Sequence, residues 1–324
     1  MDRFKNILVA AAPGHLEPLT LRAAVELADA NGARLAVSDV VMPLPGWRRT
    51  VNVEGRVINV EAAMVSEREE RLARMLQNTG DRTDLELTVT VGEPFIEVIR
   101  QVVRDGHDLV MVGEPAVENP GVPQLSSGVM HLLRKCPSPV WVMRPSANRK
   151  CAILALVDPD PDDPIRNGLN DLVMELATSL ATREQGELHV GNAWSLAGEA
   201  TLRSSSYVGL PGPIVDVMVH ETEIARRREL EALTNRHTTE SDYSIHLVAG
   251  EPGDALPRLA DQLDIGLIVM GTVGRTGLRG LIMGNTAETI LRSVRCSVLA
   301  VKPEGFATPV KKPKRSKKNK KGRP

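Results

Sequence analysis

Short apolar runs alternate with amphipathic stretches along the chain, and the spacing of their hydrophobic positions separates the two kinds of element. The first run, Asn6 to Ala11, lacks period-two alternation and is followed by Pro13 and Gly14, which is typical of a buried strand and a turn. From Glu17 to Asn31 apolar residues recur at helical spacing. The pattern continues through the first half, with expected strands at 34–41, 84–91, 108–112 and 140–143 and expected helices at 61–78, 94–105 and 127–134.

The second half repeats the order of the first. Its expected strands lie at 152–157, 187–194 and 244–249, and its expected helices at 165–183 and 213–237. Three landmarks recur 158 residues apart, which indicates a duplicated unit: Gly92-Glu93-Pro94 with Gly250-Glu251-Pro252, Gly113 with Gly271, and Pro145 with Pro303. We therefore expect two domains, residues 1–146 and 150–303, with a polar linker near Ser146 to Lys150 and a tail at 304–324.

The strands predict the fold class. They are apolar on both faces, as expected when helices cover both sides of a parallel sheet. We predict an α/β protein with two tandem, doubly wound, parallel five-stranded sheets. In such sheets ligands bind beyond the carboxyl ends of the strands, where the strand order reverses. If that order is 3-2-1-4-5, the crevice of the second domain lies between the strands that end at Asp158 and Gly271.

Amino-acid composition further restricts the class of protein. The chain has 324 residues, of which 42% are hydrophobic and only 2% aromatic, so its cores must be aliphatic. Three cysteines without a CxxC spacing argue against a disulfide framework and a thiolate zinc site. The first apolar run is too short for a signal peptide, and no stretch approaches the roughly 18 apolar residues that span a bilayer. We expect a cytoplasmic protein.

Charge is distributed unevenly. The formal net charge is -1, but Lys311 to Pro324 holds 9 of the 40 basic side chains and no acid, so residues 1–310 carry 31 basic and 41 acidic side chains, a charge of -10. The tail cannot bury apolar area, and we expect it to be disordered. Its charge suits nucleic acid, an acidic partner or anionic lipid. The alternative is a solvated tail that contacts the acidic body.

The stretch from Leu267 to Pro303 carries the clearest candidate chemistry. Between an apolar run and a helical segment it has glycines at 271, 274, 277, 280 and 284. Because glycine lets backbone N–H groups approach a ligand closely, such a loop before a helix is a natural anion cradle. Phosphate is the leading candidate for the anion.

These residues resemble the universal stress protein family, and the duplication is similar to that of its two-domain members. The family's nucleotide-binding pattern is a glycine, two residues, a second glycine, nine residues, then a glycine followed by serine or threonine. Here Gly271, Gly274 and Gly284 keep that spacing, and Asn285 stands in place of the serine or threonine. The resemblance covers nearly all of residues 3–303 and implies the family's adenine-nucleotide alpha-hydrolase-like fold.

The resemblance also implies a ligand and its contacts. ATP or a related adenine nucleotide, with Mg²⁺ as a possible companion, would bind the second domain as a regulatory ligand. Asp158 would contact the nucleoside, with Met270 beside it. Gly271, Gly274 and Gly284 would approach the phosphates, together with the helix start at Asn285 and the hydroxyl of Thr286. In the alternative reading the loop is only a connection, and Asn285 merely caps the helix.

The first domain departs from the pattern. Ala12 stands where the second domain has Asp158, and Ala116 and Ser126 replace the second and third glycines. Glu114 and Glu118 would repel phosphate. We infer that this domain has lost its nucleotide site and either acts as a scaffold or binds something else. Since domains of this family commonly pair, the two repeats are expected to pair within the chain, and a homodimer is also open.

Residues outside the glycine motif give weaker evidence of a functional site. His15 has no accompanying catalytic motif, and the remaining histidines lack metal-binding spacing, so we assign neither catalytic residues nor a metal site. Arg275 and Arg279 could reach phosphates or remain solvated. Asp160, Asp162 and Asp163 are expected to start and cap a helix. Any ATP hydrolysis would be slow. The competing function is a stress adaptor that binds protein or nucleic acid and has an empty or repurposed pocket.

Overall fold

The computed structural model describes residues 3–11, 16–77, 85–114, 125–144, 152–204, 209–238, 243–273 and 283–311. The expected linker near Ser146 to Lys150, and most of the basic tail, lie outside these residues. The first repeat contains β1 (Asn6–Ala10), α1 (Pro18–Asn31), β2 (Arg34–Val41), the short 3₁₀ helix η1 (Gly46–Arg48), β3 (Thr50–Val53), β4 (Arg56–Asn59), α2 (Val60–Gln77), β5 (Glu86–Val91), α3 (Pro94–Asp105), β6 (Leu109–Gly113), α4 (Ser127–Lys135) and β7 (Val140–Met143).

The second repeat follows the same order. It contains β8 (Ile153–Leu156), α5 (Pro164–Glu184), β9 (Leu188–Trp194), α6 (Glu199–Ser204), α7 (Gly212–His237), β10 (Tyr243–Ala249), α8 (Pro252–Gln262), β11 (Leu267–Gly271), α9 (Asn285–Ser293) and β12 (Ser297–Val301). Among the described residues, no helix is both long and apolar enough to cross a bilayer.

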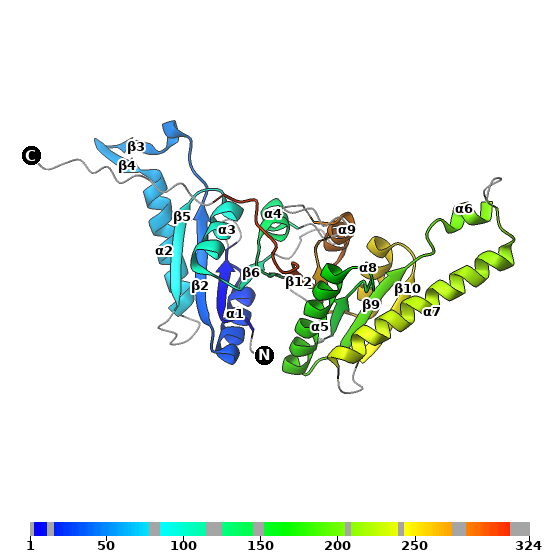
Figure 1. Ribbon diagram of the computed structural model, residues 1–324. Helices are drawn as coiled ribbons and strands as arrows, with labels where there is room; N and C mark the ends of the chain where they lie inside the picture. Colours follow the sequence, from blue (N-terminus) through cyan, green and yellow to red (C-terminus); the bar gives the residue numbers. More distant parts are fainter. Residues whose placement is uncertain are drawn as a thin grey trace, which may run out of the picture.

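The two repeats share one ten-stranded sheet, with the order β10-β9-β8-β11-β12-β7-β6-β1-β2-β5. Within each repeat the strands run parallel in the order 3-2-1-4-5, which confirms the predicted topology. The repeats join where β12 pairs antiparallel with β7, and Leu299 lies opposite Trp141. The expected pairing within the chain is therefore present, and it continues the sheet from one repeat into the other (Figure 1).

Helices cover both faces of this sheet, and each face has its own apolar core. One core packs the sheet against α1, α2, α5 and α7 and contains Leu27, Leu72, Leu176 and Leu230. The other packs it against α3, α4, α8 and α9 and contains Ile99, Leu133, Leu259 and Leu291. Because both cores draw residues from the two repeats, burial of apolar surface holds the repeats together.

Polar contacts cross the seam between the repeats. Arg134 Nη2 of α4 lies 2.5 Å from Glu288 Oε1 of α9. Arg144, just after β7, donates to the carbonyl of Val294, the residue that follows α9, and Lys302, just after β12, donates to the carbonyl of Leu133 in α4. Arg144 and Lys302 are 158 residues apart, so each repeat sends one cation to the end of a helix in the other.

Two elements were not expected from the sequence. A hairpin of β3 and β4 lies between β2 and α2, and Figure 1 shows it at the opposite end of the molecule from α6 and α7. Its turn residues Glu54 and Gly55 both have positive φ, the signature of a tight type I′ turn. The strands have only four residues each and are exposed throughout, so they lack the buried face that makes a strand recognisable in sequence. Helix α6 is similarly short and exposed.

The described chain ends on the first repeat. Val310 packs against the second core, and Arg100 Nε of α3 donates to the carbonyl of Lys311 at 3.2 Å. The start of the predicted tail thus lies against the first repeat. Disorder was predicted for residues 304–324; residues 304–311 are described, and Val310 and Lys311 contact the folded protein, so the prediction is wrong for this segment. Residues 312–324, for which disorder and partner binding were also predicted, lie outside the described residues.

Candidate functional site

A cavity of about 840 Å³ opens at the carboxyl ends of the second repeat's strands, where the strand order reverses. Six of the seven predicted site residues line it: Asp158, Met270, Gly271, Gly284, Asn285 and Thr286. The seventh, Gly274, lies outside the described residues, as do Arg275 and Arg279. The predicted residues, more than a hundred positions apart in the sequence, therefore surround one cavity.

A network of side chains holds the end of β8 in place. The Asp158 N–H donates to Asn170 Oδ1, and Asn170 Nδ2 donates back to the Asp158 carbonyl, both at 3.0 Å. Asn192 Nδ2 of β9 donates to the carbonyl of Val157 at 2.7 Å. These side-chain amides pair with backbone groups after β8 that lie beyond its last hydrogen bond to a neighbouring strand. The backbone of Asp158 is therefore fixed, and its carboxylate lies at a defined point of the cavity wall.

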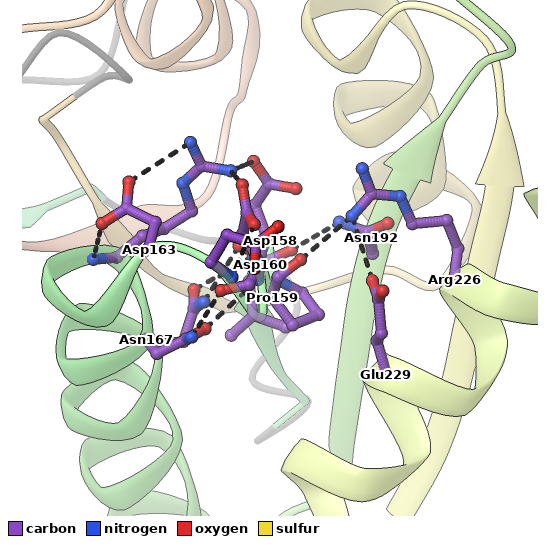
Figure 2. Close-up of polar contacts among 12 residues, drawn as sticks. Asp158, Pro159, Asp160, Asp163, Asn167, Asn192, Arg226 and Glu229 are labelled. Atoms are coloured by element: carbon purple, nitrogen blue, oxygen red, sulfur yellow. Dashed lines mark hydrogen bonds and ion pairs between the residues drawn. The ribbon is translucent and has the colours of Figure 1, made fainter.

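Carboxylates gather around one guanidinium at the start of α5. Arg166 Nη1 lies 2.7 Å from Asp160 Oδ2 and 3.5 Å from Asp158 Oδ2, and Arg166 Nη2 lies 3.5 Å from Asp163 Oδ2. Figure 2 shows Asp158, Asp160 and Asp163 with their carboxylates around this shared guanidinium. Asp163 is the N-cap of α5 and accepts from the Arg166 N–H, which confirms the expected capping role. In the described part of the chain, no cluster of acids, histidines or cysteines is arranged to hold a metal ion.

A second guanidinium reaches the cavity from α7. Arg226 Nη1 donates to the carbonyl of Pro159 at 3.0 Å and to Glu229 Oε2 at 3.1 Å (Figure 2). Arg166 and Arg226 both line the cavity with Asp158. The sequence did not connect Arg226 to the site, because only packing brings α7 beside the end of β8.

The opposite wall is the start of α9. Gly284 is the N-cap of this helix, and no side chain of the described residues caps it. The capping role that the alternative interpretation gave to Asn285 is wrong, because Asn285 is already the first helical residue, whereas a merely connecting role of the loop stays an open alternative. An uncapped helix start presents backbone N–H groups and the positive end of the helix dipole. Asn285, Thr286 and Ala287 all face the cavity.

The residues that follow β11 contact the residues that precede α9. Val273 and Met283 form an isolated antiparallel bridge, and the Gly284 N–H donates to the Thr272 carbonyl at 3.0 Å. Val273 and Met283, the described residues nearest to each other in sequence here, therefore lie side by side at the end of β11. This arrangement fixes where α9 starts relative to Gly271.

In the first repeat, a carboxylate of the protein itself occupies the position that corresponds to the start of α9. Glu114, the counterpart of Thr272, is buried, and its Oε1 accepts from the Ser126 N–H at 2.9 Å and from Ser126 Oγ at 2.6 Å. Ser126, the counterpart of Gly284, caps α4. Glutamate was expected to repel phosphate in this repeat, and the structure shows that the Glu114 carboxylate itself occupies the anion position at the start of α4. Ala12, His15, Ala116 and Glu118 lie outside the described residues.

Replacing Glu114 with alanine should destabilise the protein by about 1–3 kcal/mol, because the two hydrogen bonds that Ser126 donates to this buried carboxylate are lost. Urea unfolding followed by circular dichroism measures the change. Glu93→Ala is the matched control, since Glu93 also precedes a helix but its exposed side chain makes no capping hydrogen bond. Equal midpoints for the two variants would show that the Glu114 contact contributes nothing to stability.

A histidine pair also went unnoticed in the sequence. His189 Nδ1 of β9 and His246 Nε2 of β10 are 3.0 Å apart, although 57 positions separate the residues. Burial, and then the neighbouring His189, lower the pKa of His246. Only the pairing of β9 with β10 brings the rings together, so spacing along the chain carried no signal. The pair does not line the cavity.

Known proteins match this chain over nearly its whole length. A model of the Universal stress protein family matches residues 3–144 and 169–302. Universal stress protein E of Escherichia coli (strain K12) is 28% identical over 325 aligned residues, which cover 96% of this chain and 98% of that protein.

Solved structures show the same fold. A functionally unknown protein from Pseudomonas aeruginosa PAO1 superposes with a TM-score of 0.66 at 24% identity, over 94% of this chain and 95% of its own. A universal stress protein from Archaeoglobus fulgidus DSM 4304 superposes with a TM-score of 0.57 at 16% identity, over 92% of this chain and 98% of its own. Both cover the two repeats together.

Proposed function

The chain belongs to the Universal stress protein family as a tandem member of the type of Universal stress protein E, and from that premise we propose that its second repeat binds ATP or a related adenine nucleotide as a regulatory ligand. One observation carries the proposal. A carboxylate at the end of β8 and the uncapped start of α9 lie on the walls of the same cavity.

The cavity walls offer groups for each part of a nucleotide. Asp158 can accept hydrogen bonds from the hydroxyls of a nucleoside, while the N–H groups at the start of α9 can donate to phosphate oxygens. Met270, Leu256 and Trp194 supply apolar lining. A volume of about 840 Å³ falls within the range of about 300–1,000 Å³ common for small-molecule sites.

The two guanidinium groups add to the family pattern. Arg166 is held by three carboxylates and Arg226 by a carbonyl and Glu229, so both are positioned without a ligand. Preorganised cations lose little conformational entropy when an anion arrives. We propose that both guanidinium groups interact with the negative charge of the ligand, and we assign no catalytic residue. The first repeat, whose helix start is occupied by Glu114, is not proposed to bind a nucleotide.

Titration calorimetry and thermal unfolding with MgATP test the proposal. The wild-type protein should unfold at a higher temperature in millimolar MgATP, because a ligand that binds only the folded state stabilises it. Asp158→Ala should weaken binding about tenfold or more, as expected for the loss of a charged hydrogen-bond acceptor.

The matched control is Asp160→Ala. It removes the nearer carboxylate from Arg166, 2.7 Å away, but Asp160 is not part of the cavity lining. Affinity close to wild type in this variant would separate ligand contact from a general disturbance of the cluster. The absence of both heat and thermal shift in the wild-type protein at millimolar MgATP would refute the proposal.

A further inference from the structure

Lys302 is a buried cation at the seam whose two hydrogen bonds go to different repeats. Its side chain follows β12, and the residue is only 7% exposed. The ammonium donates to Thr272 Oγ1 at 2.7 Å in the second repeat and to the carbonyl of Leu133 in the first. The ring of Phe306 lies on a further side, with its centroid 5.3 Å from Nζ.

The Thr272 contact leads directly to the candidate phosphate site. Thr272 follows Gly271, its N–H donates to the Val301 carbonyl at 3.1 Å, and its own carbonyl accepts from the Gly284 N–H at 3.0 Å. Gly284 is the N-cap of α9. Lys302 thus holds the residue that joins the end of β11 to the start of the helix facing the cavity.

The Leu133 contact lies in the last turn of α4. Carbonyls in the last turn of a helix lack partners within the helix and carry its negative dipole end, so an ammonium is well placed there. Burial lowers the pKa of Lys302 to about 8, so the amine is charged at neutral pH. A buried charge cannot lose a partner without a large cost, so the positions of its two partners are linked.

We propose that Lys302 is a positioning residue that couples occupancy of the second repeat's nucleotide cavity to the carboxyl end of α4 in the first repeat. The inference rests on the proposed function for the identity of the ligand. A phosphate bound at the start of α9 alters the Gly284 and Thr272 contacts, and the ammonium transmits this to Leu133. By thermodynamic linkage, a change at the end of α4 alters nucleotide affinity to the same degree.

The chain contains a matched control for this contact. Arg144 occupies the equivalent place after β7; it donates to the Val294 carbonyl, and its N–H donates to Ser297 Oγ at 3.1 Å. Neither partner lines the cavity. Arg144→Met therefore removes a comparable contact across the seam while the cradle contacts stay unchanged.

Hydrogen–deuterium exchange of the full chain, with and without saturating MgATP, tests the coupling. In the wild type, MgATP should slow exchange of the Cys136 N–H, which donates to the Leu132 carbonyl at the end of α4. Lys302→Met should bind MgATP at least about fivefold more weakly, near the lower end of typical couplings, and should lose the change at Cys136. Arg144→Met should keep both the affinity and the change.

Exchange measured without nucleotide distinguishes failure of the Lys302 coupling from failure of the proposed function. Thr272→Val removes the hydroxyl that accepts from Lys302 and that also donates to the Val301 carbonyl at 3.3 Å, and it should alter exchange of the Cys136 N–H in the protein without nucleotide. That result, with no MgATP binding by the wild type, would refute the proposed function and leave the route through Lys302 standing. Unchanged exchange at Cys136 in Thr272→Val, or a MgATP-dependent change that survives in Lys302→Met, would overturn the coupling.

Discussion

Replacing Gly113 with alanine is expected to lower the free energy of unfolding by about 1–3 kcal/mol, the cost of overpacking a close-packed interior. A Cβ atom at this position would lie 2.5 Å from Glu17 Cβ and 2.6 Å from Thr20 Oγ1. Because Cβ atoms move only with the backbone, α1 itself would have to shift away from β6. Urea unfolding followed by circular dichroism measures the loss.

The equivalent change in the second repeat should cost less. A Cβ at Gly271 would meet Leu169 Cδ2 at 2.5 Å and Cγ at 2.9 Å, and the end of a leucine side chain can rotate away. Gly128→Ala and Gly168→Ala are the controls, since nothing lies within 4 Å of a Cβ built at either. Both lie in helices, so alanine should leave stability unchanged or slightly raised. A Gly113→Ala protein as stable as these controls would contradict the packing argument.

Packing alone can explain the first glycine of the motif. Gly113 is crowded by its first helix in a repeat whose later motif positions are alanine and serine. Close packing between a strand and a helix is therefore a sufficient reason for glycine at this position, with or without a ligand. The phosphate contact of Gly271 stays a prediction that the calorimetry must test separately.

The second large effect concerns Lys302 and pH. The unfolded chain keeps this proton up to the ordinary lysine pKa of 10.5, whereas burial lowers the pKa to about 8 in the folded protein. Between these values the unfolded state binds more protons, so the lysine's contribution to stability increases with pH. The full change is about 3 kcal/mol, at 1.36 kcal/mol per pKa unit.

Comparison of the wild-type protein with Lys302→Met isolates this contribution. The difference in unfolding free energy, wild type minus variant, should increase by about 3 kcal/mol from pH 7.5 to 10.5. Burial also raises the pKa of Cys136 to about 11 and that of Cys296 to about 12, which lowers stability as the pH increases. The charge of Lys302 lowers the Cys136 pKa, so only the Cys296 effect is the same in both proteins. Urea titrations at several pH values measure the difference. Parallel stability curves would show that the amine is not desolvated as the structure indicates.

Much of the site followed from the sequence because its signals are local. Glycine spacing, a strand ending at Asp158 and the 158-residue offset are properties of short segments or of their repetition. Strand order 3-2-1-4-5 then placed Asp158 beside Gly271, since those residues end adjacent strands. The pairing of β8 with β11 confirms that placement.

The sequence by itself determined the two repeats, their parallel α/β topology, and which strand ends meet at the cavity, because periodicity and turn chemistry are written in neighbouring residues. Tertiary structure alone decided that Arg166 and Arg226 reach that cavity, that Glu114 fills the first repeat's helix start, and that Lys302 bridges the seam. Each of these depends on a side chain meeting an atom of another element. Such meetings are set by how helices and sheet pack, which no local pattern of residues records.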